Sequence, residues 1–193
     1  MRTATPQSPS AAVWNVWEED GQMFRLITDT ELMHFTHHFL IRRGQVAVDA
    51  GCGTGAFSRQ LHRFGFDVTG VDFAENALAA ARRTCLPAVR YLHHDLNAGD
   101  PPALPQHGID LVVCRLVLPF LKDPAAWLRR VRDHWLRPGG RMYVVVPVID
   151  EPTPQPGAMT EAEVADLAHG WAHAYRYDLR GHLACLMLRS PAT

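Results

Sequence analysis

The sequence contains few cysteines, and their positions exclude two common roles. They show neither the paired spacing of a zinc site nor the density of a disulfide framework. The four cysteines are Cys52, Cys85, Cys114 and Cys185. We therefore expect reduced thiols, a cytoplasmic protein and no bound metal.

The sequence also lacks an excess of charge and any long apolar run. Its 19 basic and 20 acidic residues leave a net charge of -1, too little to attract a nucleic-acid backbone. The N-terminus lacks the apolar core of a signal peptide, and no later run reaches membrane-spanning length. We therefore expect no nucleic acid and no membrane among the partners. Residues 1–12 are polar and contain proline, so we expect them to be disordered.

From residue 46 onward, short apolar runs alternate with helical patterns, which is typical of a parallel sheet covered on both faces. A length of 193 residues and 47% hydrophobic residues suit one domain with one sizeable core. Strands are expected at residues 46–50, 66–71, 89–93, 109–114 and 141–147, and a C-terminal hairpin at 171–178 and 182–188. Helices are expected at 57–64, 74–81, 124–135 and 161–169, the last opened by a capping box of Thr160 and Glu163.

The first expected strand leads into Asp49 and then into glycines at every second position, Gly51, Gly53 and Gly55. Such glycines let the backbone turn sharply and approach a nucleotide-like cofactor closely. Asp49 would repel a pyrophosphate but attract an ammonium or sulfonium group, and S-adenosylmethionine carries both cations. Ala56 nevertheless completes a Gly-x-Gly-x-x-Gly/Ala pattern, so a dinucleotide remains an alternative.

Five motifs in order resemble those of class I S-adenosylmethionine-dependent methyltransferases, over about residues 46–188. They are the glycine loop at 49–55, Val71-Asp72-Phe73, His94-Asp95-Leu96, the run at 109–121, and Leu136-Arg-Pro-Gly-Gly-Arg141. The resemblance implies an α/β fold, a Rossmann-like doubly wound sheet of about seven strands. Most strands would be parallel, with a C-terminal antiparallel hairpin and helices on both faces. One domain would span residues 13–193, with an N-terminal helical cap at 13–43 and the core at 44–193.

The resemblance also implies a set of cofactor-binding residues. Asp72 lies 21 residues after Gly51, the separation expected of a carboxylate that binds the ribose hydroxyls. Phe73 would face the adenine ring, Asp95 and the Leu96 backbone would bind its edge, and Cys114 and Arg115 would line the methionine side. Asp72 and Asp95 could instead be ordinary strand-end caps, but the ordered motifs favour cofactor binding. The expected set is Asp49, Gly51, Cys52, Gly53, Gly55, Asp72, Phe73, Asp95, Leu96, Cys114 and Arg115.

Four histidines are candidates for a general base or an orienting group. His34 and His38 are four residues apart and would share a helical face, with His37 beside them, and His94 follows the third strand. These segments are expected to border the acceptor pocket. A metal site at His34 and His38 is less favoured than a solvated or pocket-lining face, because no clear third ligand accompanies them.

The segment after the fourth strand narrows the acceptor class. It lacks the Asn/Asp-Pro-Pro-aromatic run used on planar amines, and Pro119-Phe120 stands where related small-molecule enzymes often carry Glu-His. We therefore expect methyl transfer to a small organic acceptor, such as a biosynthetic intermediate, by a monomer or homodimer. The alternatives are a nicotinamide-dependent oxidoreductase and a non-catalytic protein that binds S-adenosylmethionine.

Overall fold

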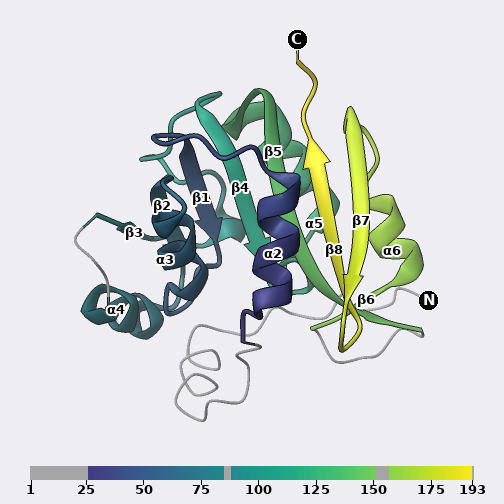
Figure 1. The fold of residues 1–193 in the computed structure, drawn as a ribbon, viewed down its shortest axis with the longest axis horizontal. Helices are drawn as coiled ribbons and strands as arrows, with labels where there is room; N and C mark the ends of the chain where they lie inside the picture. Colours follow the sequence, from purple (N-terminus) through teal and green to yellow (C-terminus); the bar gives the residue numbers. More distant parts are fainter. Residues whose placement is uncertain (1–25, 85–87, 151–156, 193) are drawn as a thin grey trace.

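The computed structural model describes residues 26–84, 88–150 and 157–192, and within them a mixed sheet forms the centre of the fold (Figure 1). Seven strands follow the order β3-β2-β1-β4-β5-β8-β7, and the short strand β6 pairs with β5. The parallel strands are β1 (Val46–Ala50), β2 (Asp67–Asp72), β3 (Arg90–His93), β4 (Ile109–Arg115), β5 (Leu136–Ile149) and β6 (Met159–Thr160). The antiparallel hairpin consists of β7 (His173–Leu179) and β8 (Leu183–Arg189). The prediction of a doubly wound sheet with a C-terminal antiparallel hairpin is confirmed.

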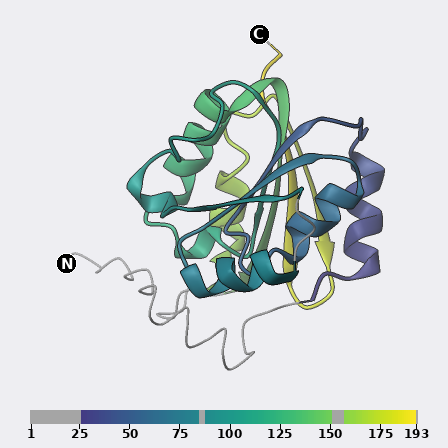
Figure 2. The same cartoon turned by 90° about the vertical axis from the view of Figure 1, so that its left-hand side faces the viewer.

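Helices cover both faces of this sheet (Figure 2). One apolar layer joins the odd-numbered β4 residues Leu111 and Val113 to one set of helices, and another joins Val112 and Cys114 to the second set. The alternation follows from the two-residue period of a strand. The first set is α2 (Asp29–His38), α3 (Ala56–Arg63) and α4 (Glu75–Thr84). The second set is α5 (Pro124–Arg130), the π-helical turn η3 (Val131–Trp135) and α6 (Glu161–Asp166).

Strand β5 begins earlier than the predicted residue 141. Leu136 already pairs with Ile109, and Arg141 pairs with Leu111, so the intervening residues form an irregularity inside the strand. Pro138 has no backbone N–H to donate, and Gly139 has a φ of 72°, so neither can continue a regular ladder. The Pro-Gly-Gly run therefore interrupts the strand, and the preceding helical turn has already ended at Trp135.

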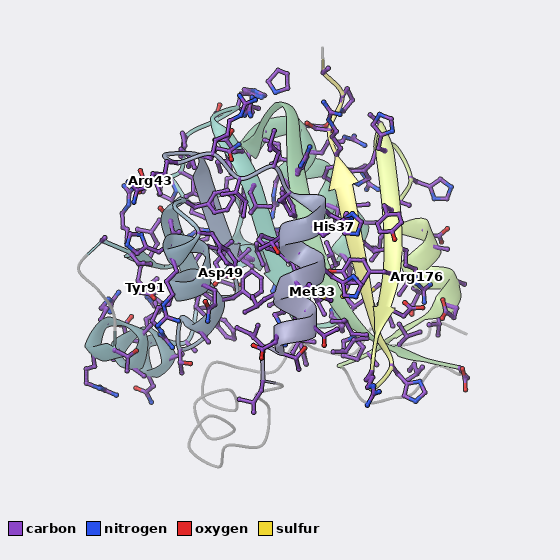
Figure 3. The ribbon with its side chains drawn as sticks, viewed as in Figure 1. Met33, His37, Arg43, Asp49, Tyr91 and Arg176 are labelled. Carbon is purple, nitrogen blue, oxygen red and sulfur yellow. The ribbon has the colours of Figure 1, made fainter. Side chains whose placement is uncertain are left out.

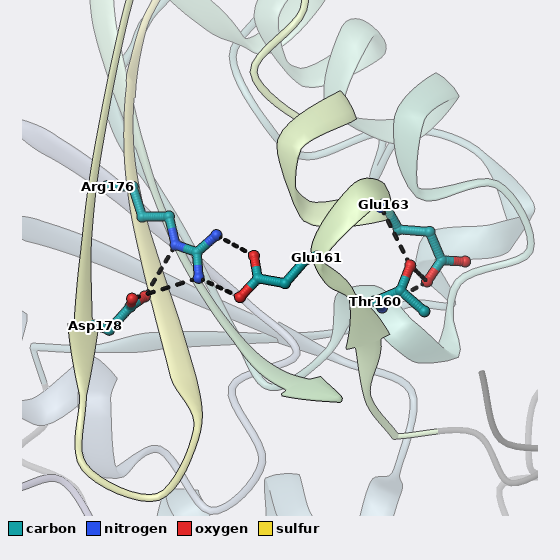
Figure 4. Close-up of polar contacts among 5 residues, drawn as sticks. All are labelled: Thr160, Glu161, Glu163, Arg176 and Asp178. Atoms are coloured by element: carbon teal, nitrogen blue, oxygen red, sulfur yellow. Dashed lines mark hydrogen bonds and ion pairs between the residues drawn. The ribbon is translucent and has the colours of Figure 1, made fainter. Parts of the chain in front are cut away.

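The capping box at Thr160 is confirmed, because its side chain accepts from the Glu163 backbone while the Glu163 side chain accepts from Thr160 (Figure 4). The helix that it opens ends at Asp166, three residues before the predicted end. Arg176 on β7 joins this helix to the hairpin by hydrogen bonds to Glu161, at 2.9 Å, and Asp178, at 2.9 Å.

The N-terminal cap is described only from residue 26, so the predicted disorder of residues 1–12 lies outside the described part of the chain. Helix α2 begins at the N-cap Thr28, whose hydroxyl accepts from the Glu31 backbone at 3.1 Å. Phe35 packs its ring against Phe57 of α3 and Tyr143 of β5, which fixes α2 on the face of the sheet. None of the described helices is long and apolar enough to cross a membrane.

Candidate functional site

The glycine loop connects β1 to α3, and three of its residues have a left-handed backbone conformation. Gly51, Gly53 and Gly55 have φ values of 73°, 51° and 76°. A Cβ on Gly51 would overlap the Val117 side chain, and one on Gly55 would overlap the Tyr91 hydroxyl. Only glycine therefore suits these two positions, for reasons of both conformation and space.

Asp72, the last residue of β2, holds the glycine loop from the neighbouring strand. Its two carboxylate oxygens accept from the backbone N–H of Gly53 at 2.8 Å and of Ala74 at 2.9 Å. Only 8% of the residue is exposed, and burial raises the pKa of the carboxyl group although these backbone donors oppose the rise. A carboxylate has about four acceptor sites, so Asp72 can still accept a hydrogen bond from a hydroxyl group of a ligand.

Asp49 is a second buried carboxylate, near the carboxyl end of β1, and is 2% exposed (Figure 3). The Ser58 hydroxyl on α3 donates to it at 2.6 Å. Burial is the main cause that raises the pKa of Asp49 to about 6, and the charge of Asp72 adds to it. A cationic ligand close to Asp49 would stabilise the buried carboxylate, because an opposite charge nearby favours its ionised form.

Asp95 and Leu96 follow β3 at the same edge of the sheet. Asp95 caps the short helix η1 (Leu96–Ala98) and accepts a hydrogen bond from the Asn97 backbone at 2.8 Å. The capping role considered for Asp95 as an alternative to cofactor binding is therefore observed. The Leu96 carbonyl accepts from Arg130 at 2.9 Å. The Asp95 side chain is exposed and can form further hydrogen bonds. Phe73 follows the adjacent strand β2, and its carbonyl forms a hydrogen bond with the His93 ring at 2.9 Å.

Cys114 and Arg115 end β4. Cys114 is fully buried, and burial raises the pKa of its thiol, as it does for Cys52 in the glycine loop. Neither thiol is suited to act as a nucleophile, because the reactive form is the thiolate. Arg115 donates to both carboxylate oxygens of Glu31 on α2, at 2.8 and 3.0 Å. This pair joins the N-terminal helix to the carboxyl edge of the sheet.

The four candidate histidines separate into two groups. His34 and His38 share a helical face as predicted, and both rings stack on Tyr177 of the C-terminal hairpin. The sheet order places three strands between this hairpin strand and β1. His37 lies on the exposed side of α2 with Met33 (Figure 3).

His94 alone among the four follows a strand at the same edge as the glycine loop. Its Nε2 is 3.1 Å from the Gly99 carbonyl. Because a carbonyl only accepts, Nε2 carries the proton, and Nδ1 is the acceptor nitrogen of the neutral ring. The structure thus places His94 beside Asp95 after β3, whereas His34 and His38 stack on Tyr177 of β7, with three strands between β7 and β1.

Three residues of this edge were not anticipated from the sequence: Glu31, Ser58 and Tyr91. The sequence contained a signal that Glu31 is buried. Glu31 lies four residues before Phe35 and eight before Phe39, which puts it on the buried face of its helix. Ser58 is buried between apolar neighbours of α3, where only the tertiary contact with Asp49 explains it. No sequence pattern marks Tyr91 as the neighbour of Gly55.

A family comparison decides between the cofactor classes left open by the glycine loop. Residues 48–144, half of the chain, match the family described as "Methyltransferase domain". The chain belongs to the S-adenosylmethionine-dependent methyltransferase family. This membership favours S-adenosylmethionine over the dinucleotide alternative.

Curated relatives of this methyltransferase chain carry the name "Ubiquinone biosynthesis O-methyltransferase". The protein of Idiomarina loihiensis is 32% identical over 139 residues, which cover 70% of this chain and 56% of the relative. The protein of Hydrogenovibrio crunogenus is 30% identical over 129 residues, covering 66% of this chain and 53% of the relative. The chain thus spans about half the length of these relatives.

Solved structures share the methyltransferase fold. An S-adenosylmethionine-dependent methyltransferase from Mesorhizobium loti has a TM-score of 0.69 at 20% identity, over 83% of this chain and 97% of the other. Phosphoethanolamine N-methyltransferase 2 of Haemonchus contortus, in complex with S-adenosyl-L-methionine, has a TM-score of 0.71 at 16% identity, over 84% and 52%. The [4+2]-cyclase SpnF has a TM-score of 0.65 at 17% identity, over 86% and 82%. These likenesses establish the fold.

Proposed function

We propose that this chain transfers the methyl group of S-adenosylmethionine to a hydroxyl oxygen of a small organic acceptor. The observation that carries the proposal is the placement of two buried carboxylates, Asp49 and Asp72, beside the glycine loop. Two positions of this loop have no room for a side chain. The names of the relatives support an oxygen acceptor and a biosynthetic intermediate as substrate.

The residues of the site fit this cofactor in charge and in hydrogen-bonding capacity. Asp72 is suited to accept from the ribose hydroxyls, and Asp49 supplies a negative charge near the loop. The side chains of Val117 and Tyr91 pack against Gly51 and Gly55, so the backbone of the loop is held close to its neighbours at these two positions. Phe73, Asp95 and Leu96 are proposed to bind the adenine, and Arg115 and Cys114 to border the methionine side.

When bound, the cofactor supplies an activated methyl group on a sulfonium. The chain's own task is to hold the acceptor in line and to exclude water, and such placement can contribute roughly 7 to 11 kcal/mol. In a transfer to oxygen, a bond between the acceptor oxygen and the methyl carbon would replace the carbon–sulfur bond, and the acceptor hydroxyl would lose its proton. We propose His94 Nδ1 as the group that receives or orients this proton.

The wall after β4 is apolar, which limits how the acceptor can be bound. Leu118 and Phe120 of the 3-10 helix η2 (Leu118–Phe120) are buried, with exposures of 0% and 8%. An aromatic or other apolar body suits this wall better than a charged group does. We further propose that the protein acts in the cytoplasm, as a monomer or homodimer.

A non-catalytic role is the second candidate, because proteins of this fold do not all carry the name of a methyltransferase and a shared fold does not fix the reaction. In that case the chain would bind S-adenosylmethionine without transferring its methyl group. Cofactor binding alone does not separate the two functions, so the test must follow the methyl group itself.

The test is incubation with methyl-labelled S-adenosylmethionine and a small-molecule fraction of cell extract, with Gly51→Ala as the matched inactive control. We expect label in a small organic product whose new methyl group is bonded to oxygen, and none with the variant. Label on nitrogen, sulfur or carbon would overturn the oxygen assignment. Cofactor binding without any labelled product, in extracts shown to contain acceptors of related enzymes, would favour the non-catalytic role.

A further inference from the structure

A cavity of about 260 Å³ lies at the edge of the sheet opposite the glycine loop. It is bordered by Gln45, which precedes β1, by Asp110 at the start of β4, and by Pro138 and Gly139 at the start of β5. The glycine loop, in contrast, follows the carboxyl end of β1. The cavity is therefore separate from the proposed cofactor site.

Four arginines line this cavity, which we call the arginine pocket: Arg42, Arg137, Arg141 and Arg189. A single carboxylate, Asp110, lies among them, so the lining carries three positive charges in excess. Asp110 is already engaged by Arg137 and by the backbone N–H of Val46, at 2.8 Å. It therefore has little capacity left to neutralise the other three arginines.

Two of the guanidinium groups have no partner within the described part of the chain. Neither the Arg42 side chain nor the Arg189 side chain forms a hydrogen bond or ion pair there. Arg189 lies over Gly139, with Nη2 3.6 Å from the position that a Cβ on that glycine would take. Arg42 and Arg189 are both exposed, so their guanidinium donors are accessible to a ligand.

Arg141 is the half-buried member of the pocket. It donates to the His38 carbonyl at 3.1 Å and lies 5.5 Å from the centre of the Phe39 ring. Burial lowers the pKa of Arg141, and the charges of Arg189 and Arg137 lower it further. The arginines thus repel one another, and a bound anion would relieve this repulsion.

We propose that the arginine pocket binds a small organic phosphate. Guanidinium groups match the phosphoryl group in charge and geometry, because each can donate two parallel hydrogen bonds to its oxygens. The exposed Leu40 and the ring of Pro138 supply an apolar border for the organic part of the ligand. The concave shape and limited volume suit a small molecule better than an extended polymer.

The test measures binding of phenyl phosphate to the full chain by calorimetry at low ionic strength. Arg189→Gln keeps a polar side chain but removes the guanidinium charge, and Arg83→Gln, exposed on α4, is the matched control. We expect Arg189→Gln to weaken binding about tenfold, since a hydrogen bond to a charged group contributes about 1.5 kcal/mol or more. Arg83→Gln and the affinity for S-adenosylmethionine should be unchanged. Arg42→Gln provides a second variant if Arg189→Gln does not fold.

Three results would overturn the proposal. The first is no binding of phenyl phosphate at millimolar concentration. The second is an equal loss in Arg189→Gln and Arg83→Gln, which would indicate unspecific attraction. The third is competition between phenyl phosphate and S-adenosylmethionine, which would place the anion at the cofactor site. Failure of methyl transfer would leave the expected phosphate binding intact, so the two proposals fail separately.

Discussion

Glu31 of α2 and Arg115 of β4 form a bidentate ion pair across 84 residues of sequence, with oxygen–nitrogen distances of 2.8 and 3.0 Å. The Glu31 side chain is 1% exposed and the Arg115 side chain 12%. Arg115 also donates to the Leu26 carbonyl at 3.3 Å, which links the chain just before α2 to the end of β4. The pair thus connects the N-terminal helix to the strand that borders the proposed methionine site.

Glu31→Gln should destabilise the fold and weaken the binding of S-adenosylmethionine. The variant leaves the partly buried Arg115 without its opposite charge, and we expect the free energy of unfolding to fall by about 2 kcal/mol. Urea denaturation measures this change. Glu161→Gln, which breaks an exposed ion pair with Arg176, is the control and should have a much smaller effect. Equal effects of the two substitutions would show that burial does not strengthen the Glu31 pair.

Asp72→Ala should weaken the binding of S-adenosylmethionine well over tenfold. The substitution removes a carboxylate proposed to bind the ribose, and it also releases the Gly53 backbone N–H. Asp67→Ala, at the exposed start of the same strand, is the matched control. Calorimetry on both variants checks the prediction, and unchanged affinity in Asp72→Ala would contradict the assignment.

Asp49 should make stability depend on pH between about 4 and 6. Its pKa in the folded protein is about 6, against an ordinary value of 3.8, so the folded state binds this proton more tightly than the unfolded state does. The contribution of Asp49 to the free energy of unfolding therefore falls as pH rises from about 4 to about 6, by on the order of 3 kcal/mol, and is constant above.

Denaturation at several pH values checks this prediction, with Asp49→Asn as the comparison. The asparagine can still accept from the Ser58 hydroxyl but does not titrate. The difference in stability between the two proteins should change with pH in the stated window. A difference that is constant with pH would mean that Asp49 titrates alike in the folded and unfolded states.

Gly51→Ala should abolish cofactor binding, whereas Gly44→Ala should not. Both glycines have left-handed φ values, 73° and 80°, so both substitutions introduce backbone strain. Only at Gly51 does the new Cβ also meet a side chain, that of Val117, while Gly44 has no neighbour within 4 Å. Thermal unfolding and calorimetry on the pair separate strain from steric overlap. Comparable loss of binding in both would indicate that strain alone matters.

His94→Gln should lower kcat about a hundredfold with little change in the affinity for S-adenosylmethionine. The glutamine amide can still donate to the Gly99 carbonyl, but it offers no basic nitrogen for the acceptor proton. His37→Gln, on the exposed side of α2, is the control. A kcat in His94→Gln that matches wild type across pH would remove His94 from the mechanism.

The sequence predicted the sheet and the glycine loop well because both depend on short-range patterns. Apolar runs at strand spacing, and the glycines after Asp49, are local features whose meaning does not change with distant contacts. The boundaries of β5 and α6 were less accurate. They depend on pairing with β4 and on packing against the sheet, which local propensity does not encode.

The sequence by itself thus determined the family motifs and the positions of the strands that carry Asp49 and Asp72. Only the tertiary structure decided which charged groups meet there and elsewhere. It paired Glu31 with Arg115, set His34 and His38 against the C-terminal hairpin, and gathered four arginines at the opposite edge. The physical reason is that these contacts join segments far apart in sequence, and their charges interact only after the sheet has brought them together.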